Sequence, residues 1–292
     1  MAAQHNKKPK GDPETTGHSW DGIEEFDNPM PRWWLWSFYI TIAWAVIYMV
    51  FYPAWPLINS ATTGILGYST RGEVAAEIAR VDAANQVWYD RLMEADLEAI
   101  RDDPELNRFA VNAGAAVFRA QCSQCHGAGA AGVQAGGFPN LLDDEWLWGG
   151  TPEDIEITVT HGIRNEDYID ARWSEMPAFG RDELLSDEEI DQVVHHVLNI
   201  SGQAHDAALA EAGAEVFDYN CSSCHGLDGE GDIYGGAPPL NNAIWLYGGD
   251  EETIRESVVN ARFGIMPGFA ERLPAAQIRA VATYIHQLGG GQ

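Results

Sequence analysis

Basic residues are scarce in this chain of 292 residues, which carries 17 Lys and Arg against 44 Asp and Glu, a formal net charge of −27. Phosphate binding requires clustered Lys and Arg, so the composition excludes a nucleic-acid-binding protein as the first interpretation. The excess of acid suits a partner with a basic surface, or solubility alone. Charge by itself does not separate these two reasons.

Cysteine is also scarce, and none occurs singly. The four cysteines form two Cys-x-x-Cys pairs, Cys122 with Cys125 and Cys221 with Cys224. A disulfide framework in a chain of this length normally spreads its cysteines along the sequence. The pairing therefore argues against a disulfide scaffold.

Formal charge is absent from residues 33–52, a mostly apolar run that as a helix spans roughly 30 Å, the thickness of a hydrocarbon core. Aromatic side chains crowd both ends of the run, as expected at two membrane–water boundaries. A cleaved signal peptide would begin nearer residue 1 and have a shorter apolar core. The sequence therefore predicts one retained transmembrane helix, in a membrane segment over residues 33–55.

The charges beside this segment predict its orientation. Four basic residues precede it, and the next one, Arg71, lies well beyond it. By the positive-inside rule, residues 1–32 are expected in the cytoplasm. Residues 33–292, with 13 basic against 38 acidic residues and a net charge of −25, then lie in the membrane or in the bacterial periplasm. We expect a single-pass protein of the bacterial inner membrane, in contact with membrane lipid.

Residues 56–105 are predicted to link the span to the rest of the chain. Pro, Gly, Ser and Thr are frequent in residues 52–70, which favours an irregular exit from the membrane. Apolar residues recur with a helical period in residues 72–103 and predict one or two amphipathic helices. We interpret them as a spacer that docks on a neighbour.

The sequence repeats itself after Pro104. AGAAVFRAQCSQCHG at residues 113–127 matches AGAEVFDYNCSSCHG at residues 212–226, at an offset of 99. The offset falls to 90 at the later Met-Pro segments, so the first repeat has nine extra residues, placed within residues 164–173. Neither copy shows strand-like alternation. We predict an all-α fold with two small tandem domains, residues 106–203 and 204–292.

Each repeat contains a motif with the spacing of a c-type haem attachment site, CSQCH at residues 122–126 and CSSCH at residues 221–225. The cysteines can form thioethers to haem, and the adjacent His126 or His225 is the expected axial iron ligand. A zinc site would leave both histidines idle, and a thioredoxin-like pair requires a βαβ surrounding that is absent. We therefore predict two tandem class I cytochrome c domains with two covalently bound haem c groups.

Met176 and Met266 are the methionines that follow the first haem motif, and each precedes a proline in a loop before the last helix of its repeat. A thioether ligand raises the reduction potential of haem iron, and we expect both methionines to be axial ligands. With histidine and methionine bound, the iron has no open coordination position. This favours electron transfer over catalysis, including over an enzyme with a haem-based active site.

Several further residues are candidates for polar contacts with haem, because buried carboxylates need donors or cations. The candidates for haem-propionate or haem-edge contacts are Trp148, His161, Arg164, Tyr247 and Arg262. The other histidines beyond the first motif, which we expect mostly at the surface or in packing, are His195, His196, His205 and His286.

HSWDGIEEFDNPMPRWW at residues 18–34, followed by the span and by FYPAWPL at residues 51–57, resembles the dihaem cytochrome c subunit of cbb3-type cytochrome c oxidases. VTHGIRNED at residues 159–167 and MPAFG at residues 176–180 resemble that family too. The haem motifs are shared with many cytochromes, whereas the N-terminal stretch is far more specific. The resemblance covers nearly the whole chain.

This resemblance implies a subunit that accepts electrons from a cytochrome c donor. It passes them to a monohaem subunit and then to a haem–copper catalytic subunit, which reduces oxygen and pumps protons. The family's axial pairs map onto His126 with Met176 and His225 with Met266, and no oxygen chemistry is expected on this chain. We also expect residues 18–31 to dock on the catalytic subunit. The alternative is an independent membrane-tethered shuttle that serves another oxidase or a photosynthetic reaction centre.

Overall fold

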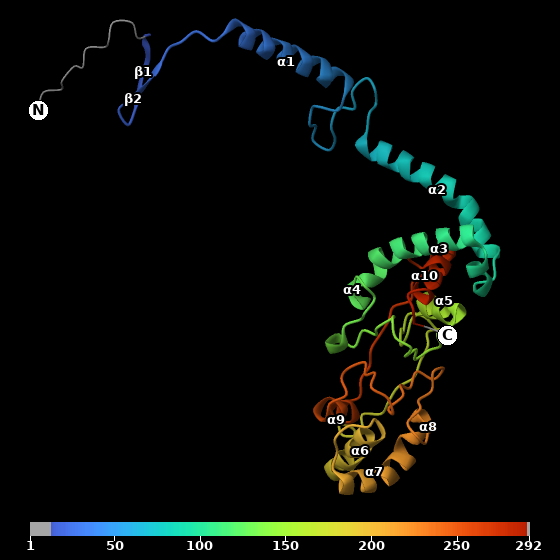
Figure 1. Cartoon of the computed structure of the whole chain (residues 1–292). Helices are drawn as coiled ribbons and strands as arrows, with labels where there is room; N and C mark the ends of the chain where they lie inside the picture. Colours follow the sequence, from blue (N-terminus) through green and yellow to red (C-terminus); the bar gives the residue numbers. More distant parts are fainter. Residues whose placement is uncertain (1–12, 291–292) are drawn as a thin grey trace, which may run out of the picture. The chain divides into compact units, whose positions relative to one another are not determined.

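The computed structural model describes residues 13–290, which are mostly helical apart from one hairpin of two short strands (Figure 1). The chain divides between Asp82 and Ala83 into two units, and each is described by itself. The first unit holds the hairpin and helix α1 (Arg32–Phe51), and the second holds both haem motifs. The predicted all-α class is confirmed as a mostly helical fold, to which the structure adds the small hairpin, and the prediction of one N-terminal candidate membrane helix is confirmed.

The segment before the candidate span forms an antiparallel hairpin of β1, Thr15–Trp20, and β2, Ile23–Phe26. Asp21 and Gly22 make the two-residue turn with φ of 55° and 83°. These left-handed conformations are typical of a type I′ turn, for which Asp-Gly is a favoured dipeptide. The Asp-Gly pair is therefore a hairpin signal inside a stretch whose composition suggests only an acidic tail.

Helix α1, Arg32–Phe51, is a candidate membrane span by its length and composition, and none of its residues is buried. Its apolar side chains are exposed on all sides, as expected for a helix surrounded by lipid. The helix ends at Phe51, earlier than the expected boundary at residue 55. Pro53 explains this end, because the residue before a proline is driven out of the helical conformation.

Residues 52–69 are irregular, as predicted, and the structure shows in addition that this loop folds back onto the end of α1. The N–H groups of Ile65 and Leu66 donate to the carbonyls of Val50 at 3.0 Å and Phe51 at 3.2 Å. These bonds satisfy carbonyls that the last helical turn leaves without partners. Gly64, at φ 69°, lies against the Phe51 carbonyl, where a Cβ would collide.

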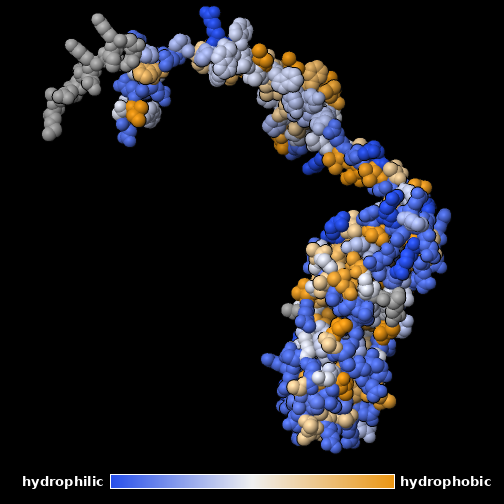
Figure 2. Space-filling model, viewed as in Figure 1, coloured by the Kyte–Doolittle hydropathy of each residue, from blue (hydrophilic) through white to orange (hydrophobic). Residues whose placement is uncertain are grey.

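Helix α2, Thr70–Glu94, and the short 3-10 helix η1, Glu98–Asp102, occupy the predicted amphipathic region. Figure 2 shows hydrophobic side chains on the surface along both α1 and α2. The end of α2 and η1 nevertheless join a small buried cluster, whose members are Leu92, Leu97, Ile100, Leu106, Ala110 and Ala280. The Arg279 guanidinium donates to the Leu92 carbonyl at 2.9 Å. The C-terminal part of the spacer thus docks on the haem-motif unit of its own chain.

The helices of the second unit begin mostly at side-chain caps. Asp103, Thr151, Ser186, Asp206 and Asp250 each accept hydrogen bonds from N–H groups of the following first turn, which would otherwise lack partners. The elements of this unit are α3 (Pro104–Val117), a π-helical turn η2 (Phe118–Cys122), α4 (Ser123–His126), a 3-10 turn η3 (Gln134–Gly136), α5 (Pro152–His161), α6 (Asp187–Ile200), α7 (Ala207–Asn220), α8 (Ser222–His225), α9 (Glu251–Asn260) and α10 (Ala275–His286).

The two repeats exchange their closing segments. Helix α10 of the second repeat packs on α3 and α5 of the first, whereas α6 of the first packs on α7 and α9 of the second (Figure 1). The first core has as buried members Phe118, Cys122, Ala130, Ile155, Val159, Phe269, Ile278, Val281, Ala282 and Ile285. The second core has as buried members Phe179, Ile190, Val193, Val194, Val197, Leu198, Phe217, Ile254 and Val258. The repeats are tandem in sequence, but each core draws on both.

The connections of the chain account for this exchange. Residues 201–206 join α6 to α7, and such a short connection makes consecutive helices antiparallel neighbours. The nine extra residues of the first repeat lie where the chain leaves the first core for the second. There Arg172 donates its N–H to the Gly162 carbonyl and accepts from the N–H of Arg164, which closes the crossing segment into a loop.

One glycine in each core permits two helices to cross in contact. Gly114 of α3 faces the carbonyl of Ala280, and Gly213 of α7 faces the carbonyl of Gln192. A Cβ at either glycine would overlap these backbone atoms, which cannot move as a flexible side chain can. The two glycines match in the sequence repeat, so both cores depend on the same small residue.

We expect Gly114→Ala to destabilise the first core by about 1–3 kcal/mol, because overpacking forces the two helices apart. Gly213→Ala should act in the same way on the second core. Thermal unfolding of the haem-loaded chain measures both effects. Gly72→Ala is the matched control, because a Cβ there meets only the Ser69 side chain at 3.4 Å. An unchanged midpoint for both core variants would contradict the crossing contact.

Candidate haem sites

Each haem motif ends in one short helical turn whose last residue is the histidine. Gly127 and Gly226 follow with φ of 79° and 78° and ψ of 154° and 162°. This backbone region is open to glycine but strained for other residues. The glycine therefore turns the chain away directly after His126 and His225, and the pattern Cys-x-x-Cys-His-Gly has a structural reason at its last position.

The two histidines are held in the same way. Nδ1 of His126 lies 3.2 Å from the Pro139 carbonyl oxygen, and Nδ1 of His225 lies 2.9 Å from that of Pro238. A ring that donates from Nδ1 keeps Nε2 as an acceptor, the arrangement typical of metal-binding histidines. Burial lowers the pKa of both imidazoles and so favours the neutral form that binds iron.

The cysteines fit haem attachment better than its two alternatives. Burial, reinforced by the neighbouring cysteine, raises the pKa of Cys122 and of Cys221 to about 11. A thioredoxin-like pair requires a thiol with a lowered pKa, so that alternative does not fit. No group of three His, Cys, Asp or Glu within residues 13–290 is placed to hold a metal ion, which leaves the zinc alternative without a site.

The two Met-Pro loops lie in exchanged cores. The Phe269 N–H, in the loop of the second repeat, donates to the Val159 carbonyl of α5 in the first repeat at 3.0 Å. The Phe179 N–H, in the loop of the first repeat, donates to the Val258 carbonyl of α9 in the second repeat at 3.0 Å. These equivalent backbone bonds carry each loop into the core of the other repeat.

This arrangement differs from the axial pairs that the resemblance implies. Met266 packs against the first core, which contains Cys122, and Met176 packs against the second core together with Cys221. The fold therefore brings Met266 to the core of the first haem motif and Met176 to that of the second. Sequence order suggests the reverse, because it assigns each loop to the motif that precedes it.

Trp148 and Tyr247 occupy matching positions in the two repeats. A Cβ on Gly236 would meet the Trp148 ring, and a Cβ on Gly137 would meet the Tyr247 ring. Each aromatic ring therefore lies against the glycine-rich loop of the other repeat. The guanidinium of Arg262 lies 5.0 Å from the centre of the Tyr247 ring. Haem contacts by these side chains stay predictions.

Arg172 is a candidate that the sequence analysis missed. Its Nη2 donates to the Asp154 carboxylate at 3.1 Å, and its guanidinium lies 6.0 Å from the centre of the Trp148 ring. Its buried Nε has no hydrogen-bond partner among the described residues, a rare state for a buried donor. A carboxylate such as a haem propionate would satisfy it, so the residues present fit the cofactor. Arg172 lies in the nine-residue insertion, where the repeat offers no counterpart to signal its role.

The remaining sequence candidates have varied surroundings. His161 ends α5, and its backbone carbonyl lies against Gly268 of the second Met-Pro loop. Arg164 donates to backbone carbonyls beside both methionine loops. His196 packs on Phe217 with ring centres 5.1 Å apart, in agreement with the expected packing role.

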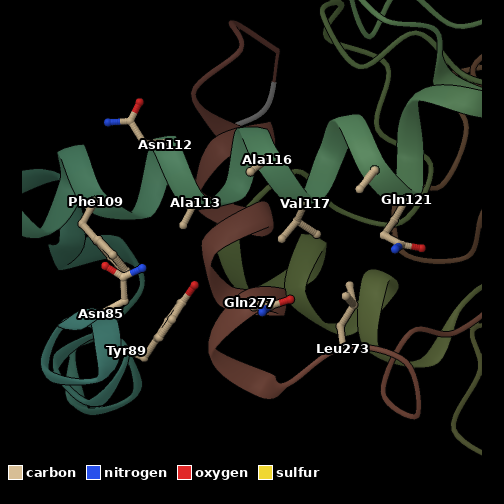
Figure 3. A pocket seen from close by; sticks show the side chains of 11 residues that line it. Asn85, Tyr89, Phe109, Asn112, Ala113, Ala116, Val117, Gln121, Leu273 and Gln277 are labelled. Atoms are coloured by element: carbon tan, nitrogen blue, oxygen red, sulfur yellow. The ribbon is translucent and has the colours of Figure 1, made fainter. Parts of the chain in front are cut away.

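A hollow of about 490 Å³ lies between α2, α3 and α10, apart from the predicted haem ligands (Figure 3). Its lining comprises Asn85, Tyr89, Phe109, Asn112, Ala113, Ala116, Val117, Ala120, Gln121, Leu273 and Gln277. The lining carries no formal charge, and Figure 3 shows Gln277 and Leu273 facing α3 across it. None of the predicted site residues lines this hollow.

The fold and the motifs define a class: a helical chain with one candidate membrane span and two cytochrome c domains. Three family models match it. Residues 12–59 match the N-terminal domain of cytochrome oxidase-cbb3, FixP. Residues 109–197 match cytochrome c oxidase, cbb3-type, subunit III, and residues 210–289 match cytochrome c. These matches confirm two tandem cytochrome c domains, which bind haem c.

Close relatives extend along the whole chain. The cbb3-type cytochrome c oxidase subunit CcoP of Cereibacter sphaeroides is 59% identical over 292 residues, covering 100% of both chains. That of Rhodobacter capsulatus is 53% identical, covering 98% of this chain and 100% of the relative. The subunit FixP of Sinorhizobium medicae is 46% identical, covering 96% and 95%. The chain belongs to the CcoP/FixP family of cbb3-type cytochrome c oxidase subunits.

Proposed function

We propose that this chain relays electrons from a cytochrome c donor to the haem–copper catalytic subunit of a cbb3-type oxidase, by way of a monohaem subunit. The observation that carries the proposal is the matched pair of haem motifs, each with its histidine oriented through Nδ1 and a methionine loop in the same core. The relatives, which are subunits of this oxidase by name, support the assignment. They favour it over an independent membrane-tethered shuttle.

Each of the two Cys-x-x-Cys pairs of this chain binds one haem c group. Cys122 and Cys125 attach one haem, and Cys221 and Cys224 attach the other. Haem iron supplies reversible one-electron chemistry when bound. If haem c is bound, the methionine thioether sulfurs of Met176 and Met266 would favour the reduced state of the iron. Together with the two histidines, they would leave no open coordination position. Oxygen reduction therefore belongs to another subunit.

The axial ligands are proposed to pair across the repeats. His126 with Met266 serves the haem of the first motif, and His225 with Met176 serves the haem of the second. The backbone bonds that carry the Met-Pro loops into exchanged cores support this pairing. Arg172, with its unpartnered buried Nε, is added to the candidates for propionate contacts.

The chain is anchored in the membrane by α1, with its N-terminus in the cytoplasm and its haem domains in the periplasm. The exposed apolar surface of α1 supports the anchoring, and the basic residues on its N-terminal side support the orientation. The charge of −25 on residues 33–292 suits a basic cytochrome c donor, because opposite charges speed encounter.

The N-terminal hairpin is the proposed docking element for the catalytic subunit. A two-stranded hairpin is marginally stable in isolation. Here the side chains of Trp20 and Ile23, a cross-strand pair beside the turn, are each 73% exposed. A partner surface that covers this pair would stabilise the hairpin and explain why an acidic segment presents apolar side chains.

The crossed pairing predicts which haem opens when one methionine is removed. In a variant with Cys221→Ala and Cys224→Ala, only the first haem remains. Met266→Ala in this background should let the reduced haem bind carbon monoxide, because its sixth ligand is lost. Met176→Ala is the matched control and should bind little. Difference spectra with carbon monoxide measure both, and the reverse pattern would support pairing within each repeat.

The acidic surface predicts a salt-dependent reaction with the donor. The second-order rate of reduction of the purified oxidase by a basic cytochrome c should fall about tenfold or more as ionic strength rises from low to physiological. Stopped-flow absorbance measures this rate. An uncharged chemical reductant serves as the control and should show little salt dependence. A flat profile with the protein donor would contradict electrostatic steering.

Deletion of residues 18–31 should reduce co-purification with the haem–copper subunit after mild detergent extraction, while both haems stay attached to the chain. Trp20→Ser with Ile23→Ser should have the same effect through loss of apolar contact alone. Glu24→Gln, a polar change in the same hairpin, is the control. Haem staining and subunit composition measure the outcome, and full assembly of the deletion variant would count against docking.

A further inference from the structure

The side chain of Arg164 joins two loops that lie far apart in the sequence. Its Nε donates to the Ser174 carbonyl at 2.6 Å, and its Nη1 donates to the Gly264 carbonyl at 3.0 Å. Hydrogen bonds from a charged donor are stronger than those between neutral groups. One guanidinium therefore fixes the backbone at two places, one in each repeat.

The two acceptor residues are equivalent in the repeat. Ser174 lies two residues before Met176, and Gly264 lies two residues before Met266, at the same offset of 90 as the methionines themselves. Arg164 thus holds corresponding points of both methionine loops. A side chain that served one haem site alone would have no reason to contact both.

The position equivalent to Arg164 in the second repeat is not basic, although its neighbour Arg262 lies over Tyr247 as Arg164 lies over Trp148. At the offset of 99, Phe263 takes its place, and the Arg164 guanidinium lies 5.4 Å from the centre of that ring. The Trp148 ring lies 6.0 Å away, within the range of a cation–π contact. The arginine therefore stacks on its own sequence equivalent, and a second arginine there would bring two like charges together.

The surroundings of Arg164 constrain it further. Its backbone has φ of 50°, a left-handed conformation uncommon for a residue with a side chain, and its N–H donates to the Arg172 carbonyl at 2.8 Å. Burial lowers the pKa of the Arg164 guanidinium. The group nevertheless stays charged, because the ordinary pKa of arginine is far above neutral. Strain of this kind persists where the surrounding structure requires a specific geometry.

We propose that Arg164 is a shared positioning residue that holds both methionine loops together, and through them the axial methionines of both haems. This role rests on the proposed ligation by Met176 and Met266. It requires the planar fork of arginine, whose several N–H donors point in fixed directions, whereas a lysine ammonium acts as a point charge. Loss of Arg164 therefore perturbs two haem sites at once.

The test compares Arg164→Gln with the unaltered chain in the purified haem-loaded oxidase. Amide hydrogen exchange in residues 174–176 and 264–266 should become about tenfold faster or more in both segments. Both c-type haems of this chain, rather than one, should gain carbon monoxide binding in the reduced state and show lowered potentials in a redox titration. In Arg164→Lys, amide hydrogen exchange should be faster than in the unaltered chain in at least one of the two segments.

Arg181→Gln is the matched control, because Arg181 follows the first methionine loop and donates to Asp182 at 3.0 Å and to the Asn260 carbonyl at 3.4 Å, but to neither Ser174 nor Gly264. It should match the unaltered chain in every readout. Three outcomes would each overturn the proposal. They are an effect of Arg164→Gln on one haem only, shifted haem potentials with unchanged amide hydrogen exchange, and an Arg164→Lys variant that matches the unaltered chain in every readout. If the unaltered chain already binds carbon monoxide at both of its c-type haems, the proposed ligation by methionine fails. Hydrogen exchange still tests whether Arg164 holds both methionine loops.

Discussion

The exchange of closing segments between the two repeats is the constraint on which the haem-motif unit depends. The N–H groups of Phe269 and Phe179 donate to carbonyls at the ends of helices in the opposite repeat. These bonds place each Met-Pro loop, and the helix that follows it, in the core that begins with the other repeat. Neither repeat contains a complete core, so we expect the unit to unfold as one cooperative structure rather than as two independent domains.

Near-symmetry between the cores makes their differences informative. Gly114 and Gly213, His126 and His225, and Trp148 and Tyr247 occupy corresponding places. Arg164 and Arg172 have no basic residue at an aligned position, because Phe263 aligns with the first and the second lies in the nine-residue insertion. The two haem sites therefore share a scaffold but differ in the charges around them. Local charge is one of the levers that separate the potentials of chemically identical cofactors.

Much of the fold could be predicted because its signals are local. The apolar run that forms α1, the capping residues before the helices and the Cys-x-x-Cys-His-Gly turns each depend on neighbours within a few residues. The Asp21–Gly22 turn is equally local and could have been recognised from the dipeptide alone. Arg172 could not, because its significance lies in a buried Nε that only packing reveals.

The sequence by itself determined the helical class, the number of haem motifs and the candidate span, and it predicted four candidate axial residues, since each is written in a short pattern. Only the tertiary structure decided how those residues combine. Two homologous repeats can close on themselves or on each other with nearly the same local contacts, so sequence similarity does not distinguish the alternatives. The short connection between α6 and α7, together with the insertion before Met176, directs the chain to the crossed arrangement. That long-range choice brings Met266 to the core of the first haem motif and places Arg164 between both methionine loops.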